Sequence, residues 1–493
     1  MIRPVSDFSK SAAELSRFIG VESNLSLQFT GITSTSTSVE AGDLFVALPG
    51  ANVHGATYID EIIARGAVGV ITDSRGGEIV GTKLPTIVIG DPRRALGDIC
   101  SWFYSSPSNS LKIAGITGTN GKTTTTTILN QILGFAGKTT GLIGTNGIEI
   151  GPEKTQANFT TPEASELQSL FAVMQERHIS HVAMEVSSHA LEARRVSGTK
   201  FALVGFTNLT QDHLDFHGDM NSYFVAKSKL FTVEYSELGF INIDDAYGKE
   251  LFNTAQIPVI SLSRENRTAQ WHFERCELRP RGYSIAIRGT GGILIEGEIN
   301  LIGDHNLDNV LMAVAMASEF DVDPLVIGNS LVQLQGAAGR LESVDIGQKF
   351  MALVDYAHTP DAVTRTLSTL RKSVDGRIIA VLGCGGDRDK TKRPIMGREL
   401  LAGSDVAIFT SDNPRSEKPE KILDEMVSGL TLGESASVTI DRREAIALAV
   451  ASALPGDCVV VLGKGHEVGQ EIAGKKYAFD DRIELARAIE ELA

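Results

Sequence analysis

The chain has 493 residues, of which 42% are hydrophobic and 22% charged, and its 61 acidic and 46 basic residues give a net charge of −15. This length is too great for one hydrophobic core and, at about 150 residues per domain, suggests about three domains. The composition is typical of a soluble globular protein, and the acidic balance argues against a nucleic-acid-binding surface.

Targeting segments and cysteine patterns are the next features that limit the class of protein. The first 20 residues lack the apolar core of a signal peptide, and no apolar run reaches about 18 residues. We therefore expect a cytoplasmic protein that is not integral to a membrane, and a monomer is the working expectation. The cysteines are far apart and predict neither a disulfide framework nor a zinc site: Cys100, Cys276, Cys384 and Cys458.

Residues 1–106 are predicted to form a small α/β domain. A hydroxyl-rich run at 32–38, I-T-S-T-S-T-S, is suited to hydrogen-bonding a polar ligand, although solvated turns have this composition just as often. The polar segment 105–110 contains a proline and predicts a linker before the next domain. The predicted strands cover 42–48, 67–72 and 86–89, and the predicted helices cover 58–65 and 92–103.

Residues 112–127, K-I-A-G-I-T-G-T-N-G-K-T-T-T-T-T, predict a strand, a glycine-rich turn and the start of a helix. Gly115, Gly118 and Gly121 let backbone N–H groups surround an anion, and Lys122 adds a positive charge. Thr123 supplies a hydroxyl that can bind the Mg²⁺ of a nucleoside triphosphate. The strict G-x-x-x-x-G-K-[ST] pattern places its first glycine at position 116, where this chain has isoleucine, so the match is a variant. A glycine-rich turn without a nucleotide is the alternative.

The rest of the region 111–340 continues to alternate strands and helices. An apolar strand near 181–186 carries Glu185, which we expect at the same sheet edge as the glycine-rich turn, in a position to help hold a metal ion. The segment 212–219, D-H-L-D-F-H-G-D, is dense in groups that suit Mg²⁺ or a polar substrate, although a solvated acidic turn has the same composition. Lys227 and Lys229 follow on a helix-like segment, where the pattern alone predicts two surface lysines.

Residues 341–493 are predicted to form a doubly wound α/β sheet without a phosphate loop of its own. Four polar loops follow its predicted strands, and strand-end loops are where such folds bind ligands. The loops read D-Y-A-H-T-P-D from 355, G-C-G-G-D-R-D-K-T-K-R-P from 383, S-D-N-P-R-S-E from 411 and G-K-G-H-E from 463. The predicted strands cover 351–355, 378–382, 405–411 and 458–462, and the predicted helices cover 360–371, 418–430, 442–453 and 481–492.

Together these motifs resemble those of one family, the Mur ligases of peptidoglycan synthesis. The similar motifs are the four C-terminal loops, G-T-N-G-K-T-T at 118–124, T-T-P at 160–162, M-E-V-S-S-H-A-L at 184–191 and D-H-L-D-F-H-G-D at 212–219. Within the family the resemblance is to the MurE type, which adds the third amino acid of the peptide. It implies three α/β domains: 1–106 for the UDP-sugar, 111–340 for ATP, and a Rossmann-like 341–493 for the amino acid.

The resemblance also implies an ATP and Mg²⁺ site on the glycine-rich turn, with Lys122 on the terminal phosphates. It implies that Lys227 is carbamylated, which turns a cation into a carboxylate and replaces the surface position that the pattern alone predicts. The implied catalytic residues are Lys122, Glu185, His213 and Lys227, and the implied metal ligands are Thr123, Glu185, His213 and the Lys227 carbamate. The implied ATP contacts are Gly118, Thr119, Asn120, Gly121, Lys122, Thr123, Thr124, Asn306, Arg340 and Asp355.

The implied reaction adds meso-diaminopimelate to UDP-MurNAc-L-Ala-D-Glu, with small molecules as the only partners. A substrate carboxylate attacks the γ-phosphate of ATP, and the incoming amine displaces phosphate from the acyl phosphate. Arg415 selects the amino acid, because a guanidinium binds the second carboxylate of diaminopimelate and repels the ammonium of lysine. The implied dipeptide contacts are Ser34, Ser36, Thr160, Thr161, Ser187 and Arg195, and the implied diaminopimelate contacts are Arg393, Asp412, Asn413, Pro414, Arg415, Gly463 and Glu467.

The N-terminal loop departs from the family pattern, T-x-D-S-R, since residues 33–37 lack both the acid and the arginine. His54 also stands where an aspartate is common, and we expect a differently hydrogen-bonded uracil site. An L-lysine-adding ligase is the nearest alternative function. A non-catalytic nucleotide-binding regulator is disfavoured by the four implied catalytic residues, and a folylpolyglutamate-synthetase-like ligase by the D-N-P-R and G-K-G-H-E loops.

Overall fold

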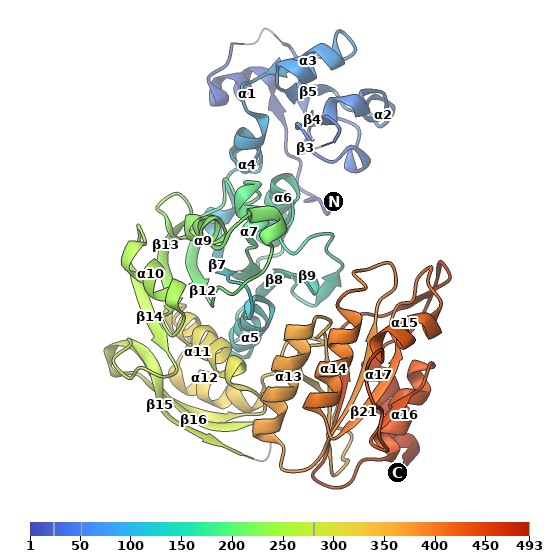
Figure 1. The fold of residues 1–493 in the computed structure, drawn as a ribbon. Coiled ribbons are helices and arrows are strands. Elements are labelled where there is room, and N and C mark those ends of the chain that lie inside the picture. Colours follow the sequence, from blue (N-terminus) through green and yellow to red (C-terminus); the bar gives the residue numbers. More distant parts are fainter. Residues whose placement is uncertain (23–24, 51, 280–281, 493) are drawn as a thin grey trace. The chain divides into compact units, whose positions relative to one another are not determined.

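The computed structural model describes residues 1–22, 25–50, 52–279 and 282–492 (Figure 1). The chain divides into two compact units. The first comprises Met1–Glu274, Ala286–Glu296 and Asp308–Leu331, and the second comprises Arg275–Ile285, Gly297–Leu307 and Val332–Ala493. Within the described ranges, no helix is both long enough and apolar enough to cross a bilayer. The domain boundaries near 106 and 340 stay predictions.

The first unit begins with a four-stranded parallel sheet. Its strands are, in sheet order, β3 (Gly31–Thr33), β4 (Asp43–Val46), β5 (Gly69–Thr72) and β6 (Thr86–Val88), and its helices are α1 (Ala12–Ile19), α2 (Ile59–Ala64), α3 (Ser74–Val80) and α4 (Pro92–Phe103). Side chains alternate along β4, so that Leu44 and Val46 join one apolar cluster and Phe45 joins another. Both faces of this sheet are therefore covered. Short elements complete the region: β1 (Lys10–Ser11), β2 (Gln28–Phe29) and the 3₁₀ helices η1 (Ser36–Ser38), η2 (Gly55–Tyr58) and η3 (Pro107–Ser110).

An eleven-stranded sheet forms the centre of the chain, and it holds the glycine-rich turn. In sheet order its strands are β10 (Glu153–Thr155), β9 (Gly147–Ile150), β8 (Thr140–Gly144), β11 (His181–Glu185), β7 (Lys112–Thr117), β12 (Phe201–Phe206), β13 (Ser236–Asn242), β14 (Val259–Ser263), β15 (Trp271–Leu278), β16 (Tyr283–Arg288) and β17 (Leu294–Ile299). The strands from β8 through β11, β7, β12 and β13 to β14 are parallel, so their carboxyl ends share one edge.

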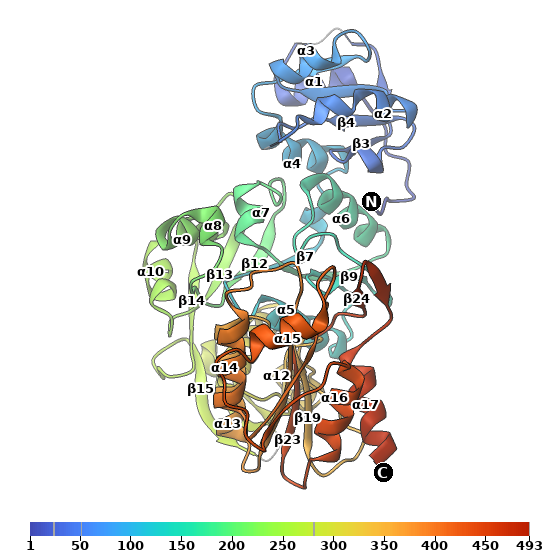
Figure 2. The ribbon, with the colours of Figure 1, turned by 45° about the vertical axis from the view of Figure 1, so that its right-hand side comes forward.

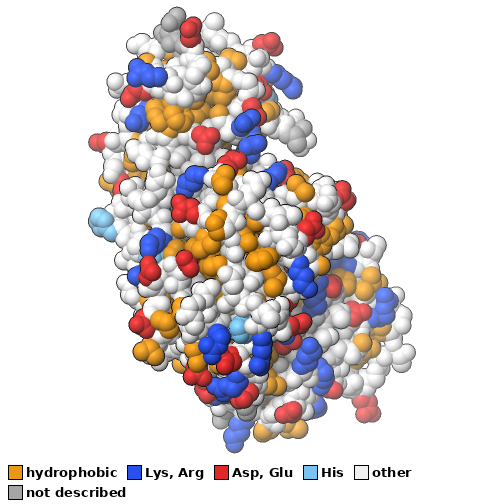
Figure 3. Space-filling model, turned by 90° about the vertical axis from the view of Figure 1, so that its left-hand side faces the viewer, with side chains coloured by type: hydrophobic (Ala, Val, Ile, Leu, Met, Phe, Trp, Pro, Cys, Tyr) orange, Lys and Arg blue, Asp and Glu red, His pale blue; other side chains and the backbone are white. Residues whose placement is uncertain are grey.

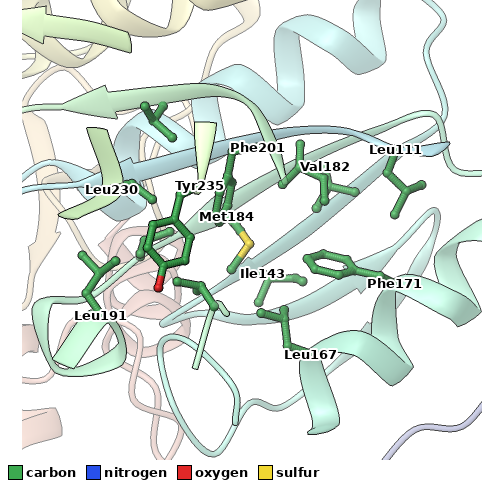
Figure 4. Close-up of a cluster of buried hydrophobic side chains, with 14 of the residues drawn as sticks. Leu111, Ile143, Leu167, Phe171, Val182, Met184, Leu191, Phe201, Leu230 and Tyr235 are labelled. Atoms are coloured by element: carbon green, nitrogen blue, oxygen red, sulfur yellow. The ribbon is translucent and has the colours of Figure 1, made fainter. Parts of the chain in front are cut away.

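Helices connect the parallel strands, and apolar side chains fill the space between helices and sheet. The helices are α5 (Lys122–Phe135), α6 (Ala164–Glu176), α7 (Ser188–Glu192), α8 (Leu214–His217), α9 (Met220–Ser228), α10 (Ala246–Thr254), α11 (Asp304–Glu319) and α12 (Pro324–Ser330). In the cluster that Figure 4 shows, Phe171 of α6 lies with Ile143, Val182 and Met184 of the strands. This packing fixes the strands whose ends carry the predicted site.

The second unit contains a six-stranded sheet covered on both faces (Figure 2). Its strands are, in sheet order, β18 (Glu342–Ser343), β19 (Met351–Asp355), β23 (Cys458–Leu462), β20 (Ile378–Cys384), β21 (Val406–Ser411) and β22 (Ala436–Val438). One apolar cluster packs α13 (Pro360–Ser373), α14 (Arg393–Gly403) and α15 (Pro419–Met426) against it, and another packs α16 (Arg442–Ala451) and α17 (Asp481–Leu492). A hairpin of β24 (Gln470–Ile472) and β25 (Lys475–Tyr477) precedes α17.

The α/β class is confirmed, and several predicted elements match the structure to the residue. These are the helices 92–103 and 481–492 and the strands 351–355 and 458–462. The helix α14 was not predicted. It follows a long polar loop, and its first residues, Arg393 and Pro394, belong to the polar motif of that loop. The segment 105–110, predicted as a linker, contains η3, in which Pro107 and Ser108 are buried.

One face of the molecule carries basic and acidic side chains interspersed among apolar ones (Figure 3). On that face neither sign of charge forms a continuous surface.

Candidate active site

The glycine-rich turn lies between β7 and α5, and its backbone geometry requires glycine. The φ angle is +147° at Gly118 and +86° at Gly121. A Cβ atom on Gly118 would lie 1.9 Å from Thr207 Oγ1, and one on Gly121 would lie 2.3 Å from Asn309 Oδ1. Helix α5 begins directly after the turn, so its first N–H groups and its dipole favour an anion there. The predicted strand, turn and helix are confirmed, but Gly115 lies within β7, where its backbone belongs to the sheet and not to the turn.

Two lysine side chains converge on one carbonyl group of this turn. Lys227 Nζ donates to Gly118 O at 2.8 Å, and Lys122 Nζ donates to the same oxygen at 3.0 Å and to Thr119 O at 2.9 Å. Lys227 is 1% exposed, whereas the side chain of Lys229 is 42% exposed. Burial lowers the pKa of Lys227 well below its usual value, and the charge of Lys122 lowers it further. The Lys227 amine therefore loses its proton far more readily than a surface lysine does.

Glu185 is a buried carboxylate at the carboxyl end of β11, next to the start of α5. It is 1% exposed, and its Oε2 accepts from Thr123 Oγ1 at 3.0 Å, while its Oε1 accepts from Thr145 N at 2.7 Å. Within the residues that the structure describes, no basic side chain pairs with it. A buried carboxylate beside hydroxyl groups is a donor set that a hard cation such as Mg²⁺ prefers. The residues at this position therefore fit the predicted ion.

His213 lies among aromatic side chains. Its side chain is 47% exposed, and its ring centroid lies 4.7 Å from that of His189 and 6.1 Å from that of Tyr223. The Tyr223 ring also lies 4.6 Å from Lys227 Nζ. Over the described ranges, no group of three or more His, Cys, Asp or Glu side chains is placed to hold a metal ion. The structure therefore joins Thr123 directly to Glu185, and it connects His213 with Lys227 through Tyr223.

Four of the predicted dipeptide contacts lie beside the end of β11: Thr160, Thr161, Ser187 and Arg195. Thr161 Oγ1 donates to Glu185 O at 2.9 Å and accepts from Ser187 N at 3.1 Å. Thr160 Oγ1 lies 3.1 Å from the hydroxyl of Thr145, which also contacts Glu185. Arg195 donates to Thr161 O at 3.2 Å. These side chains, predicted from separate motifs, therefore form one polar cluster next to the buried carboxylate.

Two charged residues join this cluster that the sequence did not single out. Glu163 Oε1 accepts from Arg195 Nε at 2.8 Å, and its Oε2 accepts from Arg93 Nη1 at 2.7 Å. The predicted contact Ser34 is tied to the same region, because its N–H donates to Ser165 Oγ at 3.3 Å. Charge alone could have pointed to Arg93, but nothing in its sequence context distinguishes it from other arginines of a helix.

His54 and Ser36 occupy the N-terminal loops where the family pattern is altered. His54 Nδ1 accepts from Ala56 N at 3.0 Å, and its Nε2 lies 3.1 Å from Asp73 Oδ1. Because Nδ1 accepts, Nε2 carries the proton and donates to Asp73. His54 thus caps η2 and joins two loops of the sheet, while Ser36 begins η1. The altered uracil site stays a prediction.

In the second unit the four polar loops leave one edge of the sheet. The register pairs Asp355 with Leu462, Leu382 with Leu462, and Cys384 with Ser411 in parallel strands. The strand ends therefore lie side by side, as the sequence predicts.

The three predicted ATP contacts of this unit are held by local contacts. Asp355 accepts from Leu341 N at 2.7 Å and from Ala357 N at 2.9 Å, and burial raises its pKa. The Arg340 guanidinium lies 5.0 Å from the Tyr356 ring centroid, and Asn306 Nδ2 donates to Ile302 O at 2.8 Å. On the same helix as Asn306, Asn309 accepts from Thr125 Oγ1 at 3.2 Å.

Arg415 is fixed by its backbone and by one carbonyl group. Its φ angle is +51°, its N–H donates to Glu471 O at 2.9 Å, and its Nη1 donates to Gly386 O at 2.6 Å. The side chain is 24% exposed, so part of the guanidinium stays accessible to a ligand. The preceding residue, Pro414, is buried.

Arg393 differs from Arg415 in being fully buried. Its guanidinium donates to Glu417 Oε1 at 2.8 Å, to Glu425 Oε2 at 2.6 Å and to Gly385 O at 3.1 Å. The hydrogen bond from Arg393 lowers the pKa of Glu417. Arg393 therefore supports the loop next to Arg415, and its direct contact with diaminopimelate stays a prediction.

Asn413, Gly463 and Glu467 lie in the strand-end loops next to Arg415. Asn413 Nδ2 donates to Glu467 Oε2 at 2.9 Å, and a Cβ atom on Gly463 would lie 2.8 Å from Asp412 Oδ2. Close contact of the two loops explains why glycine stands at 463.

A buried arginine that the sequence did not single out holds two of these strand ends. Arg442 donates to Ser411 O at 3.3 Å and to Leu462 O at 2.9 Å, and it forms an ion pair with Asp481 at 2.6 Å. Both members of the pair have fully buried side chains. Arg442 therefore fixes the ends of β21 and β23, from which the D-N-P-R and G-K-G-H-E loops leave.

The comparisons with known proteins agree with this arrangement. Three family profiles match the chain: "Mur ligase family, catalytic domain" over residues 28–104, "Mur ligase middle domain" over 116–317, and "Mur ligase, glutamate ligase domain" over 339–465. A curated protein of Streptomyces coelicolor is 45% identical over 99% of this chain and 98% of its own length. The chain therefore belongs to the Mur ligase family.

Within the family, a curated relative and a solved structure that both match nearly the whole chain carry one name. The Streptomyces coelicolor relative is called UDP-N-acetylmuramoyl-L-alanyl-D-glutamate–2,6-diaminopimelate ligase. A solved structure with that same name is 31% identical, with a TM-score of 0.75, and covers 98% of this chain and 99% of its own. A folylpolyglutamate synthase of Mycobacterium tuberculosis is 18% identical, with a TM-score of 0.59 over 74% of this chain and 91% of its own, and shares the fold.

Proposed function

We propose that this protein is an ATP-dependent ligase that joins meso-diaminopimelate to UDP-MurNAc-L-Ala-D-Glu through an acyl phosphate. The observation that carries the proposal is the grouping of Lys122, Thr123 and Glu185 around a phosphate-binding turn. Relatives similar over the whole chain, named for this reaction, support it.

The phosphate-binding turn positions ATP for attack by the dipeptide carboxylate. Backbone N–H groups at the start of α5 and the Lys122 ammonium stabilise the negative charge that develops on the transferred phosphoryl group. Lys122 would exchange its contacts with Gly118 O and Thr119 O for phosphate oxygens. Thr123 and Glu185 would hold Mg²⁺, which when bound offsets the charge of the phosphates. The cluster beside Glu185 would place the dipeptide carboxylate next to the γ-phosphate.

Lys227 serves this site as a carbamate. Carbamylation requires a neutral amine as the nucleophile toward CO₂, and the buried Lys227 amine has a lowered pKa. The carbamate carries a negative charge next to Lys122 and near Gly118. There it would add a further carboxylate ligand for Mg²⁺ beside Glu185. The negative charge of the carbamate is also attracted by the neighbouring ammonium group of Lys122.

The second unit selects the amino acid. The partly exposed guanidinium of Arg415 binds the distal carboxylate of diaminopimelate, and Glu467 receives the distal ammonium. L-lysine has a distal ammonium and no distal carboxylate, so Arg415 disfavours it.

An assay of ADP release and product mass tests this function. The chain is mixed with ATP, Mg²⁺, the UDP-dipeptide and either meso-diaminopimelate or L-lysine. We expect product and ADP with diaminopimelate. Preference for L-lysine would show that the chain is the L-lysine-adding ligase. If no ADP is released with either amino acid, the chain would be a nucleotide-binding regulator.

A further inference from the structure

Lys464 is a buried ammonium group between the two loops that the proposed function assigns to diaminopimelate. Its side chain is 0% exposed, and Nζ donates to Gly469 O at 2.6 Å, to Asn413 Oδ1 at 3.2 Å and to Glu467 Oε2 at 3.4 Å. These three acceptors match the three donors of an ammonium group. A lysine is rarely so deeply buried unless its charge is paired. The buried Lys464 ammonium therefore constrains the groups that surround it.

The first consequence concerns Asn413. Its Oδ1 accepts from Lys464 Nζ and also from Glu471 N at 3.0 Å. Both of these groups are obligate donors, so the orientation of the amide is fixed. The Nδ2 group must then point to Glu467 Oε2, as observed at 2.9 Å.

The second consequence concerns Glu467. Its Oε2 receives two donors, from Lys464 and Asn413, while within the described residues Oε1 has no hydrogen-bond partner. The side chain is 37% exposed. One carboxylate oxygen is therefore anchored in the protein, and the other is left to accept from a ligand.

The third consequence concerns the charges around Lys464. Lys464 Nζ also lies 3.9 Å from Asp412 Oδ1, so one buried cation stands beside two carboxylates. The remaining negative charge attracts an ammonium group, while Arg415 attracts a carboxylate. An amino acid whose far end carries both groups is complementary to this pair of loops.

We propose that Lys464 is a positioning residue that orients Glu467 and Asn413 for the distal ammonium of the amino-acid substrate. This inference rests on the proposed function and adds a specificity-determining residue to it. Lys464 acts through Glu467 and does not itself reach the substrate.

The test compares meso-diaminopimelate with 2-aminopimelate, which lacks the distal amine and keeps the distal carboxylate. The measured quantity is the ratio of kcat/KM for the two amino acids. For Lys464→Met we expect this ratio to fall by about 10-fold or more, because Glu467 loses its fixed orientation. The KM values for ATP and for the UDP-dipeptide should stay unchanged. The matched control is Lys421→Met, an exposed lysine of α15, which should keep the ratio.

A double variant separates positioning from general damage. In a Glu467→Gln background, Lys464→Met should cause no further fall in the ratio, since both changes act on one interaction. If Lys464→Met does not fold, Asn413→Asp replaces the amide donor of Glu467 with a repelling carboxylate and should lower the ratio as well. A folded Lys464→Met or Asn413→Asp variant with the ratio of the unmodified chain would overturn the inference. Lack of ligation by the unmodified chain would overturn the proposed function instead.

Discussion

The side-chain nitrogen of Lys227 donates to the carbonyl oxygen of Gly118 at 2.8 Å, in a position where the lysine is 1% exposed. The same oxygen accepts from Lys122. Burial and the neighbouring positive charge of Lys122 both disfavour a proton on Lys227 in this position. The predictions about charge and catalysis at the glycine-rich turn follow from this relationship.

Lys227 should make the free energy of unfolding depend on pH. Its folded-state pKa is lowered from 10.5, so between the two values the unfolded state binds a proton that the folded state lacks, and stability rises as pH increases through this window. Lys227→Met should flatten this rise in bicarbonate-free buffer, whereas Lys229→Met should keep it. Urea unfolding at a series of pH values measures the effect. If the free energy of unfolding rose equally steeply with pH in Lys227→Met and in the unmodified chain, burial would not neutralise this amine.

Lys122→Ala should lower kcat for ligation by about 10²–10³-fold, because it removes a charge that stabilises the transferred phosphoryl group. The comparison variant is Lys249→Ala, an exposed lysine of α10 in the same unit. Steady-state ADP release measures both. Ligation at an unreduced rate by Lys122→Ala would refute the role of this turn.

Arg442→Met should destabilise the second unit by about 3–5 kcal/mol, because it leaves Asp481 buried without its partner. Its neighbour Arg443 pairs with Glu484, and the Arg443 side chain is 48% exposed. Arg443→Met should therefore lower the free energy of unfolding by only about 0–1 kcal/mol. Denaturant unfolding of the two variants makes a matched comparison. If the two variants lost similar amounts of unfolding free energy, the buried pair would not hold the ends of β21 and β23.

Arg415→Ala should weaken recognition of the distal carboxylate. Loss of a charged hydrogen-bonding partner at a binding site costs about 2–5 kcal/mol, which is about 30-fold or more in kcat/KM for diaminopimelate. Arg398→Ala, an exposed arginine of α14, serves as the control. An Arg415→Ala enzyme that still prefers diaminopimelate over L-lysine to the original degree would place selectivity elsewhere.

The sequence predicted the elements of this fold best where local signals were strong. Apolar runs and a capped, proline-led start marked helix 92–103, and continuous apolar strands marked 351–355 and 458–462. The helix α14 was missed because its start is polar and lies inside a longer polar run. The strands β15–β17 were missed although they follow one another both in the chain and in the sheet, because charged residues interrupt the apolar pattern of β15 and β17.

The candidate site shows the same division between local and long-range information. The glycine-rich turn could be identified from its own residues, since Gly118 and Gly121 meet a backbone requirement that the pattern itself expresses. The burial of Lys227 could not, because the helical pattern around it predicts a surface position. Only the family resemblance pointed to Lys227. Arg442 was missed because its partners Ser411, Leu462 and Asp481 lie 20 to 39 residues away in the sequence. Lys464 lies within the quoted G-K-G-H-E loop, but no local pattern shows that its side chain is buried.

The most direct test of the proposed chemistry follows oxygen from substrate to phosphate. The UDP-dipeptide is labelled with ¹⁸O in the glutamate side-chain carboxylate, ligation with diaminopimelate is run in unlabelled water, and the released phosphate is examined by mass spectrometry. The account predicts labelled phosphate, because the carboxylate oxygen bonds to phosphorus in the acyl phosphate and leaves with it. Unlabelled phosphate formed together with the amide product would contradict it.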